Sequence, residues 1–164
     1  MSAVLQSGRR RIRRMLISDV PAVHAIELIA YPYPWSRQVF ADCLAAGYSG
    51  CVSELDGQLA GYGLLSAAAG EGHILNLCVS PHYQRQGHGA ALLRRLLDLG
   101  RWYRLERVLL EVRQSNHAAI ELYRRHQFEL IGTRPDYYPH TEGREAALVM
   151  ARRLFNGGYS VDQP

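Results

Sequence analysis

Two periods of hydrophobic and polar positions divide this chain into segments. Runs that are apolar, or that alternate between apolar and polar residues, are typical of strands; they cover 11–16, 50–55, 59–66, 73–79, 108–112, 128–133 and 146–152. Apolar residues three and four apart are typical of amphipathic helices; they predict helices that begin at Ser18 or Asp19, Ser36, Gly87 and Asn116. Helices interspersed with strands favour a mixed sheet flanked by helices, in one domain of the α+β class.

Turn-forming residues separate several of these segments. Asp56-Gly57, between two strand-like runs, predicts a tight hairpin. Two prolines in the stretch 31–35, Tyr-Pro-Tyr-Pro-Trp, exclude regular structure there. The stretch 67–72 and the aromatic stretch between the last two strands are expected to be loops. Pro21 fits the first turn of the first helix.

The stretch 73–93 carries the most specific pattern in the chain. An apolar strand ends at Ser80-Pro81, a polar loop follows with Gly87 and Gly89, and an apolar-periodic helix begins after it. The first N–H groups of a helix lack internal partners, and the helix dipole favours an anion there. Glycines let the backbone approach a phosphate closely. The pattern predicts a pyrophosphate site; an ordinary strand–helix connection is the alternative.

Two common nucleotide signatures are excluded. No Lys-Ser or Lys-Thr pair follows the glycines, so the loop is not a P-loop. No third glycine and no suitably spaced acid complete a dinucleotide-binding fingerprint. The sequence Gln84-x-x-Gly87-x-Gly89 instead resembles the pyrophosphate loop, Q/R-x-x-G-x-G/A, of the GCN5-related N-acetyltransferases, the GNAT superfamily.

Further motifs occur in the order expected for that superfamily. They are Tyr33-Pro34-Trp35-Ser36, Asn76-Leu77-Cys78-Val79, Leu110-Glu111-Val112-Arg113-x-Ser115-Asn116, Ala119-Ile120-x-Leu122-Tyr123, and Tyr137-Tyr138-Pro139 with Gly143-Arg144-Glu145-Ala146. The combination spans about residues 15–152 and is similar to the RimI-type alanine N-acetyltransferases, which modify the amino terminus of a small-subunit ribosomal protein. The resemblance implies an enzyme that transfers acetyl from acetyl-CoA to the N-terminal α-amino group of a protein.

The resemblance also makes the expected fold specific. It implies the GNAT fold, a mixed and mostly antiparallel sheet of seven strands flanked by four helices. The strand 73–79 should bulge and splay from the strand 108–112, and the gap should hold the pantetheine arm of acetyl-CoA. The domain is expected over 11–154, between a flexible Arg-rich segment at 1–10 and a flexible tail at 155–164.

Two residues are candidates for the proton transfers that acetyl transfer needs. Glu111 interrupts the apolar run 108–112, and a carboxylate among apolar neighbours is costly unless it is used; the alternative is an ion pair with Arg113 or another arginine. Tyr123 shares a helix side with Asn116; the alternative is a ring packed in the core with its hydroxyl bonded to the backbone. The resemblance assigns Glu111 as the base that takes the amine proton and Tyr123 as the acid that protonates the leaving thiolate.

The resemblance further implies which residues hold acetyl-CoA. Main-chain groups of 77–79 should bond the pantetheine in the manner of an added strand, and the loop 85–90 should hold the pyrophosphate. Asn116 is expected to cap its helix and to contact the pantetheine. The His88 side chain either contacts a phosphate or is exposed without a role. The predicted cofactor-binding residues are Leu77, Cys78, Val79, Arg85, Gln86, Gly87, His88, Gly89, Ala90 and Asn116.

Aromatic residues in two proline-containing stretches are the candidates for the acceptor site. Tyr33, Trp35, Tyr137 and Tyr138 are expected to form an apolar slot for a small first side chain. Aromatic packing beneath loops is the alternative, and it is favoured for Tyr31. Acids that could face a basic peptide are not ranked by the sequence; they are Glu27, Asp42, Glu142 and Glu145.

Charge changes the picture only near the amino terminus. The pI is about 9.1, all 19 basic residues are arginine, and five of them lie in the first 14 residues. The remaining 14 arginines face 15 acids, so the rest of the chain is close to neutral. The favoured interpretation is a solvated tail that leads into a first strand; the alternative is attraction to ribosomal RNA or another acidic surface.

Cysteine usage and hydropathy bear on the compartment. Cys43, Cys51 and Cys78 have no spacing typical of a metal site and are interpreted as buried thiols of a reducing compartment. No apolar run approaches the ~20 residues of a membrane helix. The sequence predicts a cytoplasmic protein with no metal and no membrane contact. Two other functions stay open: a GNAT enzyme that acetylates lysine side chains or a small amine, and a non-catalytic acyl-CoA-binding module that docks on RNA.

Overall fold

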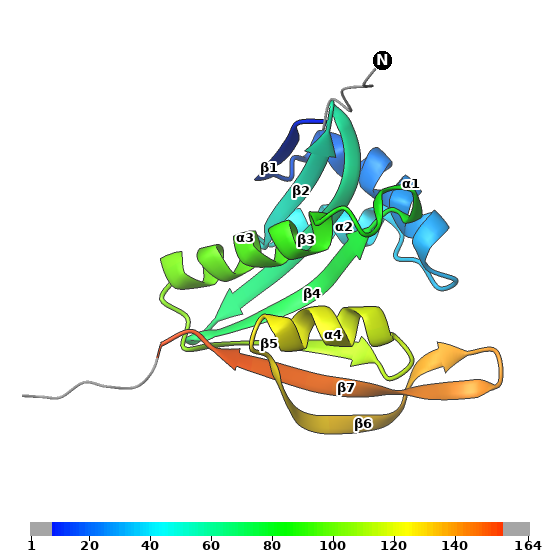
Figure 1. Ribbon diagram of the computed structural model, residues 1–164, viewed down its shortest axis with the longest axis vertical. Coiled ribbons are helices and arrows are strands. Elements are labelled where there is room, and N and C mark those ends of the chain that lie inside the picture. The colour runs from blue at the N-terminus through cyan, green and yellow to red at the C-terminus, as the bar shows by residue number, and fades with distance from the viewer. Residues whose placement is uncertain (1–7, 156–164) are drawn as a thin grey trace, which may run out of the picture.

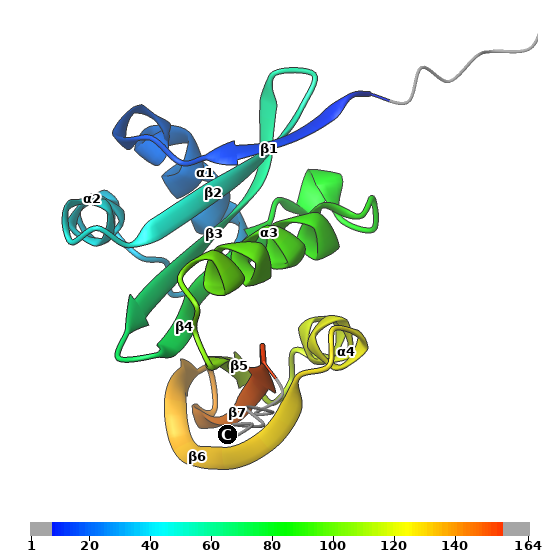
Figure 2. The same ribbon diagram turned by 90° about the vertical axis from the view of Figure 1, so that its left-hand side faces the viewer.

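The computed structural model describes residues 8–155, which form one sheet with helices on both faces (Figures 1 and 2). The strands are β1 (Arg10–Arg14), β2 (Ser49–Leu55), β3 (Gln58–Ala68), β4 (Glu71–Val79), β5 (Arg107–Arg113), β6 (Glu129–His140) and β7 (Gly143–Arg153). The helices are α1 (Val20–Ala30), α2 (Arg37–Ala45), α3 (His88–Trp102) and α4 (His117–Arg125), with the 3-10 turns η1 (Ile17–Asp19) and η2 (Pro81–Tyr83).

The sheet has the order β1-β2-β3-β4-β5-β7-β6. Within the described residues, β4 and β5 are the one parallel pair, and every other pair is antiparallel. The predicted fold is therefore confirmed: a mixed, mostly antiparallel sheet of seven strands with four helices.

Two hydrophobic clusters lie on opposite faces of the sheet. Val23 of α1 and Phe40 of α2 pack with Tyr62 on one face. The leucines of α3 pack with Ile120 of α4 and Val112 of β5 on the other. Figure 2 shows α3 and α4 on the side of the sheet away from α1 and α2. The apolar stripe of each helix therefore decides which face it covers.

β4 leaves β5 halfway along its length. Glu71–Ile74 pair with Arg107–Leu110, and in the described residues no β4–β5 pairing follows Ile74. β4 also bulges against β3 at this point, because Leu75 has no partner in the register. The predicted bulge and splay are both confirmed. The free part of β4 leads through η2 into the start of α3 (Figure 1).

Two stretches predicted as loops are instead hairpins. β3 and β4 continue through 67–72 and turn at Ala69-Gly70, whose φ angles are 51° and 78°. Two consecutive positive φ angles match the twist of a two-residue hairpin. The loop prediction is wrong there because an alanine occupies a position usually marked by asparagine or aspartate.

The aromatic stretch is the second hairpin, because β6 extends to His140 and β7 begins at Gly143. Pro135 and Pro139 are tolerated because β6 is an edge strand. The register between β6 and β7 shifts over 134–138, so the residues around Pro135 need not pair with β7. The two prolines of this stretch therefore mark an edge strand.

Side-chain caps hold two of the helix starts. Ser36 and Asn116 cap α2 and α4, as predicted. Asp19 makes no capping bond to α1. Its carboxylate instead accepts hydrogen bonds from the Arg13 guanidinium and from the Leu16 N–H. The expected cap at Asp19 is replaced by a link between β1 and η1.

β1 begins at Arg10, so this arginine of the predicted tail lies in the sheet, opposite Leu55. The predictions for residues 1–7 and 156–164 fall outside the described residues. Between residues 8 and 155, no helix is long and apolar enough to cross a membrane. The same residues contain no cluster of His, Cys, Asp and Glu that could hold a metal ion.

Candidate active site

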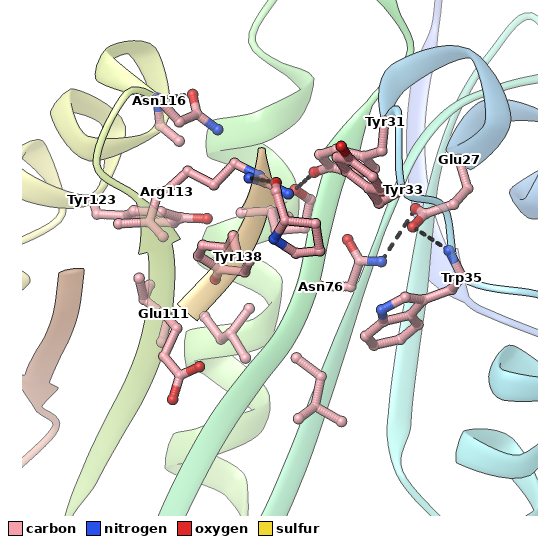
Figure 3. Close-up of a pocket in the computed structure, with 17 residues that line it drawn as sticks. Glu27, Tyr31, Tyr33, Trp35, Asn76, Glu111, Arg113, Asn116, Tyr123 and Tyr138 are labelled. Atoms are coloured by element: carbon pink, nitrogen blue, oxygen red, sulfur yellow. Dashed lines mark hydrogen bonds between the residues drawn. The ribbon is translucent and has the colours of Figure 1, made fainter. Parts of the chain in front are cut away.

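The divergence of β4 and β5 opens a cavity of about 330 Å³, which we call the splay cavity (Figure 3). Its walls come from α1 and the segment after it, from β4 and β5, from α4 and from the β6–β7 hairpin. Its lining includes residues predicted for catalysis, for acetyl-CoA binding and for acceptor binding. They are Tyr33, Trp35, Leu77, Glu111, Asn116, Tyr123 and Tyr138.

Glu111 lies on β5, and its side chain projects from the face opposite Leu110 and Val112, which are buried in the core. Its side chain is 13% exposed, and its carboxylate is 3.1 Å from Nε of Arg134 on β6. Hydrogen bonding to this carboxylate, followed by burial, raises the pKa of the Tyr137 hydroxyl above its usual value. Glu111 therefore lines the cavity and also forms an ion pair with an arginine, and its role as the base stays a prediction.

Tyr123 projects from α4 into the cavity wall and is 6% exposed. Its ring packs against Phe128, with the ring centroids 5.7 Å apart. Burial raises the pKa of its hydroxyl well above the ordinary value. The phenol therefore stays protonated at physiological pH and has a proton to donate.

Glu111 and Tyr123 approach the gap from opposite sides of β5. Tyr123 belongs to the cluster under α4, whereas Glu111 faces the β6–β7 hairpin. Figure 3 shows the Glu111 carboxylate pointing away from the Tyr123 hydroxyl. A reacting group seated in the splay would meet a carboxylate on one side and a phenol on the other.

β4 presents an unpaired edge to the splay. Leu77, Cys78 and Val79 pair with β3 on one side. The side facing β5 has no strand partner among the described residues. Main-chain groups on a free edge can bond an extended ligand as an added strand. This edge could bond the pantetheine arm of acetyl-CoA, the contact that the family resemblance implies.

The start of α3 has the features of an anion site. Gly87 is its N-cap with φ of 84°, and no side chain caps the helix. The first main-chain N–H groups of α3 are therefore left for a ligand. Arg85 also has a positive φ, of 60°. At the back of the loop, Nη1 of Arg10 donates to the Gln86 carbonyl at 2.9 Å. The loop fits a pyrophosphate.

The side chain of His88 turns away from this loop. It is 2% exposed, and its Nδ1 lies 2.6 Å from Oγ of Ser53 on β2. Burial, and then the charge of Arg10, lower the pKa of the imidazole. Of the two alternatives for this side chain, exposure without a role is wrong, because the first residue of α3 faces the sheet. Only the main-chain N–H of His88 is left to meet a phosphate.

The cysteines are buried free thiols, as predicted for Cys43, Cys51 and Cys78. Cys78 packs in the cluster under α1, and burial raises its pKa to about 11. A thiol that stays protonated is a poor nucleophile. The geometry therefore favours direct acetyl transfer over an acetyl-cysteine intermediate.

An arginine joins the two aromatic stretches on the acceptor side. The Arg113 guanidinium carbon lies 4.5 Å from the ring centroid of Tyr138 and 5.9 Å from that of Tyr33. Arg113 also pairs with Glu145, at 3.4 Å. Stacking on both rings links the segment after α1 to the β6–β7 hairpin. The segment after α1, which includes Trp35, and the β6–β7 hairpin form one wall of the cavity.

The remaining aromatic residues differ from expectation. Tyr31 lines the cavity, and its hydroxyl donates to the Leu77 carbonyl at 3.4 Å, so it does more than pack beneath a loop. Tyr137 is 41% exposed and packs edge to face against Tyr138, beside Glu111 and outside the lining of the cavity.

Three residues at the site have no role assigned by the sequence pattern: Glu27, Asn76 and Arg134. A signal for Glu27 exists, because it follows Val23 by four residues and so lies on the buried stripe of α1. Nothing local marks Arg134, since it reaches Glu111 through pairing of distant strands. Asn76 is marked only as part of a motif.

Sequence comparison agrees with this geometry. The sequence model of the acetyltransferase (GNAT) family matches residues 17–128. The protein named ribosomal protein bS18-alanine N-acetyltransferase from Escherichia coli K12 is 39% identical over 134 residues, which cover 82% of this chain and 90% of that protein.

Solved structures share the fold over nearly the whole chain. The crystal structure of the E. coli ribosomal-protein-S18-alanine N-acetyltransferase matches with a TM-score of 0.88 and 35% identity, over 93% of this chain and 99% of that one. A Salmonella typhimurium structure with its cofactor acetyl-CoA matches with a TM-score of 0.77 and 20% identity. The match covers 94% of this chain and 99% of that one and shows the same fold. This chain belongs to the GNAT family and is an acetyl-CoA-dependent N-acetyltransferase.

Proposed function

We propose that this enzyme acetylates the N-terminal α-amino group of a protein, with the alanine terminus of a small-subunit ribosomal protein as acceptor. The name of the 39% identical E. coli relative supports this acceptor. The observation that carries the proposal is the splay cavity, which Glu111 and Tyr123 line from opposite sides of β5. A ribosomal acceptor implies that the enzyme works in the cytoplasm.

The splay holds the activated acetyl group. Acetyl-CoA supplies that group as a thioester. The free edge of β4 bonds the pantetheine arm, and the amides at the start of α3 bond the pyrophosphate. The bulge takes Leu75 out of register with β3, and in this proposal a main-chain N–H of the bulge stabilises the carbonyl oxygen as it becomes negative.

Two side chains move the protons. Glu111 takes a proton from the acceptor ammonium through water, and the neutral amine then attacks the carbonyl carbon. As the C–N bond forms, the C–S bond breaks, and Tyr123 donates its proton to the leaving sulfur. The acylated nitrogen releases its second proton to water, and water returns a proton to Tyr123. Tyr33, Trp35 and Tyr138 narrow the acceptor side, which favours a small first residue.

The acceptor is tested with two peptides. One begins with alanine and contains an internal lysine; the other is identical but has a blocked N-terminus. We expect CoA release and acetylation, located by mass spectrometry, only with the free terminus. Acetylation of the lysine in the blocked peptide would contradict the proposal in favour of a lysine acetyltransferase. Acetyl-CoA binding without CoA release would contradict catalysis on peptides.

The base is tested by Glu111→Gln. The change keeps the shape of the side chain but removes the proton acceptor, so we expect kcat to fall about 100-fold. The Kd for acetyl-CoA, measured by calorimetry, should stay within about twofold, because β4 and α3 hold that ligand. Glu121→Gln on the exposed side of α4 is the control. Unchanged turnover in Glu111→Gln would remove this residue from the mechanism.

A further inference from the structure

The splay cavity holds a second carboxylate that the mechanism above does not use. Glu27 of α1 is 2% exposed and lines the cavity on the side of the aromatic segment 31–35. None of the ion pairs found among residues 8–155 includes it. A buried carboxylate without a cation is costly unless several donors bond to it. Its retention at this point calls for a physical reason.

Three donors from three different elements bond to this carboxylate. Oε1 accepts from the Trp35 main-chain N–H at 3.1 Å. Oε2 accepts from the Asn76 amide on β4 at 3.2 Å and from the Tyr62 hydroxyl on β3. Figure 3 shows the bonds to Trp35 and Asn76. Glu27 therefore ties the segment after α1 to the two strands that form the floor of the cavity.

The segment 32–35 has few other anchors. Pro32 and Pro34 have no N–H, so the segment cannot join a ladder of backbone hydrogen bonds. In the part of the chain that the structure describes, the Trp35 N–H to Glu27 is the one hydrogen bond found for its main chain. The Glu27 carboxylate supplies the main-chain contact that a regular element would provide.

Aromatic packing also joins the segment 31–35 to α2 and β3. The Trp35 ring packs on Phe40 of α2, with centroids 5.3 Å apart, and Phe40 packs edge to face on Tyr62 at 5.5 Å. Tyr62 is also a donor to Glu27. Losing the carboxylate would leave Tyr62 and Trp35 without their polar partners and would loosen the wall that Tyr33 and Trp35 form.

We propose that Glu27 is a positioning residue for the acceptor. It fixes the segment 31–35, and with it the width of the acceptor slot, by bonding the Trp35 N–H. This inference rests on the proposed function of that slot. We expect Glu27 to act on acceptor binding and not on acetyl-CoA, because the main chain of β4 is held by its pairing with β3 and the bonds found for Glu27 include none to the start of α3.

Steady-state kinetics separate these effects. Glu27→Ala should raise KM for the alanine peptide about tenfold, as expected for losing hydrogen bonds to a charged group, while KM for acetyl-CoA stays within about twofold. Glu27→Gln keeps an acceptor oxygen for the Trp35 N–H, so its KM for the peptide should lie much closer to the wild-type value than that of Glu27→Ala. Glu121→Gln, an exposed change on α4, is the matched control. An unchanged peptide KM in Glu27→Ala, or equal rises in both KM values, would overturn the proposal.

Fluorescence gives a second readout that needs no turnover. The chain has two tryptophans, and Trp102 is 80% exposed, so Trp102→Phe leaves Trp35 as the only reporter. In this background, Glu27→Gln and, where it folds, Glu27→Ala should increase acrylamide quenching of Trp35, with the larger increase in Ala. Quenching equal to that of the parent in both would also overturn the proposal.

Failure of the proposed function gives a different result. A wild type that acetylates only lysine side chains would contradict the N-terminal acceptor. The KM comparison then runs with that lysine peptide, and the quenching comparison is unaffected. The role of Glu27 is therefore decided separately from the identity of the acceptor.

Discussion

Burial sets the protonation states of two residues beside the splay cavity. Tyr123 and Cys78 both lie out of water, and burial raises the pKa of each. A raised pKa keeps a phenol protonated and a thiol neutral. The same effect makes Tyr123 a proton donor and removes Cys78 as a nucleophile, so direct attack on the thioester is the chemistry that the residues support.

Tyr123→Phe tests the acid. Phenylalanine keeps the packing on Phe128 but has no proton to give, so we expect kcat to fall about 100-fold, with the Kd for acetyl-CoA unchanged. Tyr103→Phe, outside the cavity, is the control. Because the pKa of Tyr123 is raised, kcat of the wild type should not decline between pH 7 and about 9. A decline there that vanishes in Tyr123→Phe would contradict this role.

The sequence marks some site residues and not others, for physical reasons. Glu111 is visible because an acid interrupts an apolar strand, and that pattern is local. Tyr123 needs the family motif, because a helix tyrosine is usually a packing residue. The partners of Glu27 come from β3, β4 and a proline-rich segment, and only the fold brings them together. The direction of His88 depends on how α3 lies on β2.

At the scale of elements, one ion pair joins β1 to the turn before α1. The Arg13 guanidinium donates to both oxygens of Asp19, at 2.7 and 2.8 Å, and the Leu16 N–H donates to the same carboxylate. Hydrogen bonds from Arg13 are the main cause that lowers the pKa of Asp19 below its usual value. The side chain of Asp19 is 11% exposed, so solvent screens this link only in part.

This link makes stability depend on pH. Because the pKa of Asp19 is lower in the folded state, the unfolded state binds the proton more readily. The stabilisation is complete above pH ~4, the unfolded value, and is lost as pH falls through the folded pKa. Asp19→Asn should cost about 2–4 kcal/mol at pH 7 in urea unfolding. It should also reduce the loss of stability between pH 5 and about 2.

The control for Asp19 is Asp98→Asn, which removes an exposed ion pair with Arg101. It should change the unfolding free energy little, because exposed pairs contribute little. The same dependence on pH in wild type and Asp19→Asn would show that the link does not stabilise the fold.

Regular elements are predictable where the pattern is local. The helices and the hairpin at Asp56-Gly57 follow from apolar spacing and turn chemistry. The two missed hairpins lie at 67–72 and in the aromatic stretch after Arg134. In both, tertiary pairing overrides residues that usually mark a loop: an alanine in a left-handed turn, and prolines in an edge strand.

At the scale of the whole molecule, the splay results from the strand order. β5 pairs with β4 over only four residues on one side and with β7 along its full length on the other. The splay cavity is therefore lined from both sides of β5, by Glu111 on one side and Tyr123 on the other. No local pattern specifies this order, because it depends on pairings between distant strands. Family resemblance, not periodicity, predicted it.

A cavity lined from both sides of β5 predicts the kinetic mechanism. Acetyl-CoA and the acceptor peptide can occupy the splay together, so initial rates measured against both substrates should give intersecting double-reciprocal lines. Intact-mass analysis of enzyme incubated with acetyl-CoA alone should show no added acetyl group. Parallel lines together with an acetylated Cys78 would contradict direct transfer.

The central claim is that one gap seats the thioester between a carboxylate and a phenol. The most direct test is a crystal structure with a conjugate of CoA and an alanine-starting peptide. We predict the pantetheine between β4 and β5, the pyrophosphate at the start of α3, and the peptide nitrogen between Glu111 and Tyr123, beside Trp35. A conjugate bound elsewhere, or β4 and β5 paired along their whole length, would contradict the account.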